Sequence, residues 1–385
     1  MEYFPRKISE AVASAVRYFS VIVVTGPRQS GKSTLCNHLF EHYRHFNMED
    51  IGLRQAVKTD PKGFLDSCGK EVVIDEVQHV PDLLSYVQLV VDADDSRRFV
   101  LTGSSNFALL ESVTQSLAGR AALFTLLPFS IDEVSGRKLL STDRLLVEGL
   151  YPGVVAKGIP HELFYRNYYS TYIERDVRRL SGITNLDAFQ HFIRLAAARC
   201  GNEFNASSLA VEVGVSSPTI KSWLGILKAS FIAFSLQPYH TNISKRLAKT
   251  PKIYFYDTGL LCWLIGINTP QQLSCHPLRG AIFENFAVVE LLKMQHNADS
   301  FAQMCFYREN SGREVDVMIA DGIKYDIFEI KSAKTFNPDF LKNINYLSAL
   351  LEDKIARKTV VYDGDAIPPN VINIRDIATL ANSKE

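Results

Sequence analysis

The sequence predicts an α/β fold whose first part is a parallel sheet with helices on both faces. Short apolar runs of strand length alternate with stretches whose apolar residues follow helical spacing. This alternation is typical of parallel sheets, because each crossover to a parallel neighbour needs a helix. The expected strands lie at 21–26, 71–76, 98–106 and 121–130, and the expected helices at 8–19 and 81–94.

After about residue 140 the pattern changes to helical segments, and a second α/β region begins near residue 276. A chain of 385 residues has room for about two to four domains. The later helices are expected at 161–180, within 205–236 and at 281–296, and the later strands near 303–308, 314–320 and 323–331.

The composition indicates an ordinary soluble globular protein, with 46% hydrophobic and 22% charged residues. The formal net charge of +0 gives no global sign of a nucleic-acid or membrane partner. The six cysteines form no C-x-x-C pair, so neither a zinc ribbon nor a disulfide framework is expected. Charged residues interrupt the first 20 positions, and no apolar run approaches the ~20 residues that span a bilayer. We therefore expect a cytoplasmic protein without a membrane partner.

A phosphate-binding loop is predicted at residues 26–33, which read GPRQSGKS and match G-x-x-x-x-G-K-[ST]. An apolar strand precedes the motif and a helical stretch follows it, as the motif requires. Lys32 would reach the β- and γ-phosphates of ATP, and Ser33 would hold Mg²⁺. The expected nucleotide-binding residues are Gly26, Pro27, Arg28, Gln29, Ser30, Gly31, Lys32, Ser33, Thr34 and Asp75.

Two carboxylates, Asp75 and Glu76, follow the second apolar run. Asp75 suits a role at Mg²⁺, and Glu76 suits the base that orients the attacking water. Small polar residues end the third run, where Ser104 and Asn106 are candidates for sensing the γ-phosphate or for a plain turn. Arg120 suits an arginine finger that acts through self-association, or it is a surface arginine.

The combination of GPRQSGKS, VVIDE, LTGSSN and SLAGR followed by LPFS resembles one group of bacterial and archaeal AAA+ ATPases. In that group a C-terminal domain of unknown function follows the ATPase core. The segments 172–176 and 254–260 match as well. The resemblance implies an AAA+ ATPase core at 1–140, a helical lid or linker at 141–182, a winged-helix-like domain at 183–265 and a restriction-endonuclease-like α/β domain at 266–385. It implies no settled physiological role.

Residues 207–227 follow a helix-turn-helix layout, with Gly214 at the turn. The second helix would bury Ile220, Trp223, Leu224 and Leu227 and would present Thr219, Lys221 and Ser222 to a major groove. A wing would add Lys245, Arg246 and Lys249 as phosphate contacts. Such folds also serve only as packing modules, so DNA remains one of two interpretations.

A β-hairpin is expected around Asp321-Gly322. If these two residues form the turn, Asp316 pairs with Ile327 and Glu329 lies diagonal to Asp316. Two carboxylates at that separation can share a divalent ion, and Lys331 on the same face can position the attacking water.

This D…E-x-K order is similar to the PD-(D/E)XK nuclease core, and Glu284 matches the acid that such nucleases bring from their first helix. The metal ligands would then be Glu284, Asp316 and Glu329, with Lys331 as a catalytic residue. Val315 departs from the proline of that pattern. A solvated hairpin face and a degenerate nuclease fold used for binding are the alternatives.

The leading hypothesis is an ATP-driven switch protein that acts on nucleic acid, with a metal-dependent nuclease at its end. The alternative is an ATPase that regulates a partner protein or a promoter and has a catalytically inactive C-terminal domain. A small-molecule P-loop kinase is disfavoured by Asp75-Glu76 and by the long C-terminal part.

Overall fold

The computed structural model describes residues 3–103, 116–134, 140–177, 183, 185–239, 250–300, 302–309 and 311–381. The chain forms two compact units. The first contains Met1–Phe129 with the short pieces Ala229–Phe231 and His296–Asp299, and the second contains the remaining residues. Within the described residues, no helix combines the length and apolarity needed to cross a bilayer.

The first unit is built on a five-stranded sheet in the order β2-β3-β4-β1-β5, in which every pair is parallel. The prediction of a parallel sheet is therefore confirmed. The strands are β1 (Val21–Thr25), β2 (Arg44–Asn47), β3 (Glu71–Asp75), β4 (Arg98–Gly103) and β5 (Ala121–Thr125). The helices are α1 (Ser9–Ala15), α2 (Lys32–Leu39), α3 (Ile51–Thr59), α4 (Pro61–Ser67), η1 (Val77–His79) and α5 (Leu83–Ala93).

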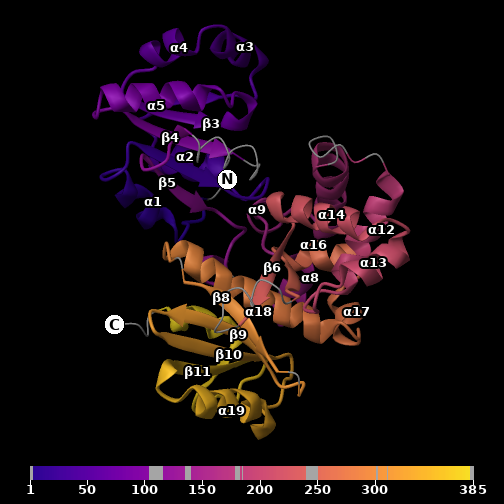
Figure 1. Cartoon of the computed structure of the whole chain (residues 1–385). Coiled ribbons are helices and arrows are strands. Elements are labelled where there is room, and N and C mark those ends of the chain that lie inside the picture. Colours follow the sequence, from indigo (N-terminus) through magenta and orange to yellow (C-terminus); the bar gives the residue numbers. More distant parts are fainter. Residues whose placement is uncertain are drawn as a thin grey trace. The chain divides into compact units, whose positions relative to one another are not determined.

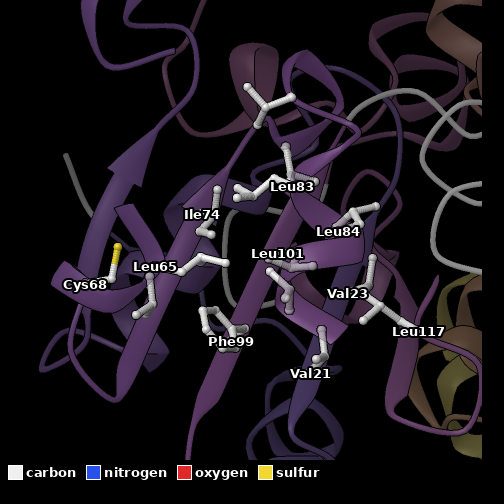
Figure 2. Packing of buried hydrophobic residues seen from close by; sticks show 14 of the residues in the cluster. Val21, Val23, Leu65, Cys68, Ile74, Leu83, Leu84, Phe99, Leu101 and Leu117 are labelled. Atoms are coloured by element: carbon white, nitrogen blue, oxygen red, sulfur yellow. The ribbon is translucent and has the colours of Figure 1, made fainter. Parts of the chain in front are cut away.

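Both faces of this sheet are buried, which explains why its strands read as continuous apolar runs. Val21 and Val23 of β1 pack into one cluster, whereas Ile22 and Val24 pack into the cluster on the opposite face. Figure 2 shows the first cluster, in which side chains from several strands meet those of α4 and α5. The expected strand at 121–130 ends at Thr125, and the next residues run beside the phosphate-binding loop.

The second unit contains a seven-stranded sheet in the order β12-β11-β10-β9-β8-β6-β7 (Figure 1). Its strands are β6 (Ala233–Pro238), β7 (Lys252–Phe255), β8 (Met304–Arg308), β9 (Glu314–Asp321), β10 (Lys324–Lys331), β11 (Ile355–Tyr362) and β12 (Val371–Asn373). Because β6 pairs with β8, this sheet crosses the boundary expected at residue 265. The division into four domains stays a prediction.

The helices of the second unit precede, interrupt and follow its strands. They are α7 (Ile131–Val134), α8 (Thr142–Glu148), α9 (Pro152–Val155), α10 (His161–Tyr168), the π-helix η2 (Tyr169–Val177), α12 (Leu186–Ala198), α13 (Ala206–Val213), α14 (Ser217–Ala229), α16 (Thr258–Leu264), α17 (Pro270–Ser274), α18 (Arg279–Asn297), η3 (Pro338–Leu341), α19 (Lys342–Leu351), η4 (Glu352–Lys354) and η5 (Ile374–Leu380).

The helix pair α13 and α14 has the layout that the sequence predicts. Gly214 ends α13 at φ 77°, a left-handed conformation that glycine adopts without strain. The stripe expected on α14 is buried, and it consists of Ile220, Trp223, Leu224 and Leu227. Lys221 and Ser222 are exposed, and Thr219 is half-buried. The expected wing residues Lys245, Arg246 and Lys249 lie outside the described residues, and DNA contact stays a prediction.

The hairpin of β9 and β10 forms, but its expected register is wrong. Asp321 pairs with Lys324, so the turn residues are Gly322 and Ile323 instead of Asp321 and Gly322. The observed ladder sets Met318 against Ile327, and both side chains are fully buried. The expected register would have set the carboxylate of Asp316 against Ile327. Burial of this apolar pair favours the observed register, whose ladder ends with Phe328 paired to Val317.

Candidate functional site

The phosphate-binding loop lies between β1 and α2, at the edge of the sheet where all five parallel strands end. Its backbone has positive φ angles at Gly26 (143°), Gln29 (61°) and Gly31 (99°). At Gly26 the close approach of another segment also requires glycine, because a Cβ atom there would lie 2.2 Å from the Leu126 carbonyl oxygen. The strand, the loop and the helix thus have the arrangement that the motif requires.

Lys32 is buried in this loop. Its Nζ donates hydrogen bonds to the carbonyl oxygens of Gly26, at 3.1 Å, and of Pro27, at 2.9 Å. Burial lowers the pKa of the Lys32 ammonium to about 8, although the nearby carboxylates of Glu76 and Asp75 act in the opposite direction. The phosphates of a nucleotide would offer this partly desolvated ammonium a stronger partner than two carbonyl groups do.

Asp75 ends β3 and Glu76 follows it, and Thr102 of the neighbouring β4 forms a hydrogen bond with each. The Thr102 hydroxyl donates to Asp75 Oδ1 and accepts a hydrogen bond from the Glu76 N–H at 3.3 Å. Glu76 itself has a left-handed backbone, with φ 53°, and its side chain accepts a hydrogen bond from Gln78 Nε2. Sequence reasoning missed Thr102 and Gln78. The position of Thr102 at the end of an expected strand was the available signal.

The other expected nucleotide-binding residues differ in how far they are exposed to solvent. Ser30 is buried, Arg28 and Ser33 are half-buried, and Gln29 and Thr34 are exposed. Ser104 and Asn106 lie outside the described residues, and their roles stay predictions.

Arg120 forms an ion pair with Asp92 of α5. Its Nε lies 2.5 Å from Asp92 Oδ1, and its Nη2 lies 2.8 Å from Asp92 Oδ2. The hydrogen bonds that Arg120 donates to the Asp92 carboxylate raise the pKa of its guanidinium. To act on a nucleotide bound by a second copy, Arg120 would have to exchange this carboxylate for phosphate oxygens. Its role as an arginine finger stays a prediction.

Arg6 is a further residue of this site that the sequence did not reveal. Its guanidinium is buried beside the loop and donates to the carbonyl oxygens of Ser30, at 2.9 Å, and Leu127, at 2.6 Å. It also lies over the Phe129 ring, 4.7 Å from the ring centroid. A single arginine 20 residues before the motif gives no sequence signal for this contact.

In the second unit, the structure brings the predicted nuclease-like residues into one neighbourhood. Lys331 Nζ lies 2.7 Å from Glu329 Oε1, and Asp316 Oδ2 accepts the Ile330 N–H at 2.7 Å. Burial raises the pKa of Asp316 well above its ordinary value, and the charges of Glu284 and Glu329 raise it further. Burial likewise raises the pKa of Glu329, whose buried Oε2 has no hydrogen-bond partner among the residues that the structure describes.

Lys252 of β7 joins this acidic cluster, and sequence reasoning missed it. Its buried Nζ lies 3.1 Å from Glu284 Oε1 and also forms an ion pair with Glu314. The Tyr254 hydroxyl donates to the same Glu284 oxygen at 2.6 Å. Across the part of the chain that the structure describes, no group of three or more His, Cys, Asp or Glu side chains is arranged to hold a metal ion. Metal binding by Glu284, Asp316 and Glu329 stays a prediction.

Three protein families match successive parts of the chain. Residues 18–135 match the model of an AAA domain, residues 140–271 match a domain of unknown function (DUF8612), and residues 279–379 match a domain of unknown function (DUF4143). The chain thus begins with a segment that matches an AAA domain. Two segments follow whose families have no stated function.

Two relatives of this chain are described as uncharacterized proteins. A protein of Mycobacterium tuberculosis is 29% identical over 365 residues, which cover 94% of this chain and 80% of that protein. A protein of Haemophilus influenzae is 23% identical over 381 residues, which cover 88% of this chain and 90% of that protein. The Walker-type ATPase of Pyrococcus abyssi is a solved structure with 15% identity and a TM-score of 0.45, covering 68% of this chain and 96% of that chain. The AAA-domain match and the geometry of the loop together support a P-loop ATPase domain of AAA type in residues 18–135.

Proposed function

We propose that the first unit binds ATP with Mg²⁺ at the loop 26–33 and hydrolyses it. The observation that carries this proposal is the convergence of Lys32 with the carboxylates of Asp75 and Glu76 at one edge of the sheet. Loop N–H groups and Lys32 would bind the phosphates. Glu76 would accept the proton of the attacking water, and Asp75 would be held for its task by Thr102.

The donor atoms at this site fit magnesium. Mg²⁺ prefers oxygen ligands, and the Ser33 hydroxyl and the Asp75 carboxylate are of that kind. When bound, the ion would neutralise charge that develops on the phosphate oxygens. The residues of the chain would orient the nucleotide, hold the water and take up its proton.

Two substitutions test the proposal in solution. Lys32→Ala should abolish ATP binding, because the phosphates lose their counter-charge inside the loop. Glu76→Gln should retain binding and lose turnover, because only the base is removed. Glu71→Gln is the matched control, since Glu71 is exposed at the opposite end of the same strand. Parent-like hydrolysis by Glu76→Gln would show that another residue is the base.

For the second unit we propose that the protein acts on nucleic acid through α14 and the cluster around Glu329, with metal-dependent cleavage as the reaction at that cluster. The ion pair of Lys331 with Glu329, whose charges both act on Asp316, supports this proposal. The alternative is a catalytically inactive domain that binds a partner protein or a promoter. The contact of Lys252 with Glu284 favours that alternative, because a lysine already neutralises the acid.

Duplex binding at low salt is the first measurement for this second proposal. Lys221→Glu should weaken binding and reduce its salt dependence, because one phosphate contact is lost. Lys228→Glu is the control, since Lys228 is also exposed on α14 but lies in its last turn. Absence of any duplex binding by the parent protein would favour the packing and partner-binding interpretation.

A further inference from the structure

A buried arginine from the segment before α1 contacts the outer side of the phosphate-binding loop. Arg6 has only 7% of its surface exposed, so its charge is almost fully removed from water. Burial of a charge is costly unless good hydrogen bonds replace the water. Arg6 makes such bonds to the carbonyls of Ser30 and Leu127, and it packs over Phe129.

The bond to Ser30 fixes one peptide group inside the motif. The Ser30 carbonyl belongs to the peptide group that joins Ser30 to Gly31, and no peptide bond of the described chain is cis. In a trans peptide group the C=O and the N–H point in opposite directions. Because the oxygen points at Arg6, the Gly31 N–H points away from it. A phosphate-binding loop works by aiming such N–H groups at the nucleotide.

The bond to Leu127 ties the same guanidinium to the segment that follows β5. That segment already presses on the start of the loop, where Leu126 leaves no room for a side chain at Gly26. The Leu126 N–H also bonds to the Thr25 carbonyl at 2.8 Å. Arg6 therefore holds the second half of the loop against a support that is itself fixed to the first half.

We propose that Arg6 is a positioning residue for the nucleotide, which orients the Ser30–Gly31 peptide group so that the Gly31 N–H meets a phosphate oxygen. This inference rests on the proposed ATP binding. The buried positive charge strengthens the effect, because a hydrogen bond from a guanidinium polarises the peptide group more than a neutral donor would. The contacts of Arg6 described above are with two backbone carbonyls and an aromatic ring, so we expect its effect to fall on nucleotide affinity.

The chain offers a matched control in Arg97. Arg97 donates to a backbone carbonyl, that of Leu65, at 2.7 Å, and lies over the Phe99 ring, 5.3 Å from its centroid. It precedes β4, so it lies at the end of the sheet opposite the loop. Arg97→Met thus removes similar contacts from the same unit without touching the nucleotide site.

The experiment measures the Kd of ATP with Mg²⁺ by calorimetry, kcat at saturating ATP and the urea midpoint of unfolding, for the parent, Arg6→Met, Arg6→Lys and Arg97→Met. We expect Arg6→Met to raise Kd roughly tenfold, the size of one lost charge-assisted hydrogen bond. Its kcat should fall by less than about threefold, because Glu76 is untouched. Arg6→Lys should give an intermediate Kd, since an ammonium replaces only part of the bidentate contact.

The inference is overturned if the Kd of Arg6→Met lies within twofold of that of Arg97→Met at similar unfolding midpoints. Arg6 would then have a merely structural role. If Arg6→Met does not fold, Arg6→Lys decides: a raised Kd at a parent-like midpoint supports the inference, and a parent-like Kd overturns it. If the parent itself binds no ATP, the proposed function fails and this inference fails with it. If Lys32→Ala loses ATP binding and Arg6→Met binds ATP as the parent does, the inference about Arg6 is overturned and the proposed function stands.

Discussion

The hydroxyl of Thr102 donates a hydrogen bond to the carboxylate of Asp75, and this contact joins the ends of two neighbouring strands. The sheet order explains the contact, because β4 lies between β3, which carries Asp75, and β1, which leads into the phosphate-binding loop. Thr102 is fully buried and also accepts the Glu76 N–H. One side chain therefore fixes both acids of the proposed hydrolytic site.

Thr102→Val should reduce ATP turnover more than ATP binding. The valine has nearly the same shape, but it leaves the Asp75 oxygen and the Glu76 N–H without their partner. We expect kcat to fall about tenfold, as for a misplaced catalytic group, with a smaller change in Kd. Thr102→Ser restores the hydroxyl and should recover most of the activity. Equal kcat for the valine and serine variants would contradict this role of the hydroxyl.

Affinity for ATP should fall as the pH rises through about 8, the value to which burial lowers the pKa of Lys32. Below that pH the ammonium is charged and attracts the phosphates, and above it the free protein holds a neutral amine. Bound phosphates favour the charged form, so binding above the lowered pKa takes up a proton. Calorimetry in EDTA, in two buffers of different ionisation enthalpy, measures this uptake without metal. Lys32→Arg keeps its charge and should show neither the fall nor the uptake.

Gly26→Ala should destabilise the first unit and weaken ATP binding, because the new Cβ would lie 2.2 Å from the Leu126 carbonyl oxygen. Gly119→Ala is the control: Gly119 also has a positive φ, 77°, but no atom of the described residues would lie within 4 Å of its Cβ. The control should lose only the free energy that alanine costs in a left-handed backbone conformation, about 1 kcal/mol. Chemical denaturation should show a larger loss of unfolding free energy for Gly26→Ala. Equal losses for the two variants would mean that the loop and the Leu126 segment separate easily.

Much of the first unit could be predicted from the sequence, because strand, loop and helix signals there are local. The loop 26–33 and the carboxylates after β3 follow directly from runs of neighbouring residues. Arg6 and Lys252 could not be found in this way, because each acts on residues more than 20 positions away. The hairpin register failed for a related reason. The Asp-Gly pair is a local signal, whereas the burial of Met318 against Ile327 depends on the rest of the core.

The proposed role of Arg120 in a second copy of the chain can be tested by the dependence of ATPase activity on protein concentration. If Arg120 acts on the nucleotide of a second copy, ATPase activity per subunit should rise with protein concentration. An equimolar mixture of Arg120→Ala and Lys32→Ala should then regain activity, because one copy supplies the arginine and the other the loop. Asp92→Ala removes the carboxylate that Arg120 binds in its own chain and should increase activity at low concentration. Activity per subunit that is independent of concentration would assign Arg120 to the surface pair with Asp92.

The last prediction concerns the acidic cluster of the second unit and whether it takes a divalent ion. Four acids lie around two lysines there: Glu284, Glu314, Asp316 and Glu329 around Lys252 and Lys331. Lys252 holds Glu284 and Glu314, so an incoming ion would have to displace a buried ammonium. If Lys252 stays bound to both acids, as in the catalytically inactive alternative, Mn²⁺ should leave the melting temperature of the parent protein unchanged when nucleotide is absent.

Lys252→Met should reverse this behaviour. Without the ammonium the acids repel one another, and the variant should be less stable than the parent in the absence of metal. A divalent ion relieves that repulsion and binds the folded state, so Mn²⁺ should raise its melting temperature. Adding Asp316→Ala to Lys252→Met should remove the shift. Lys293→Met is the control, because Lys293 is also buried and paired with a glutamate, Glu290 at 2.7 Å. A Mn²⁺ shift in the parent that disappears in Asp316→Ala would instead show that the metal displaces Lys252, and it would favour the nuclease proposal over a catalytically inactive domain.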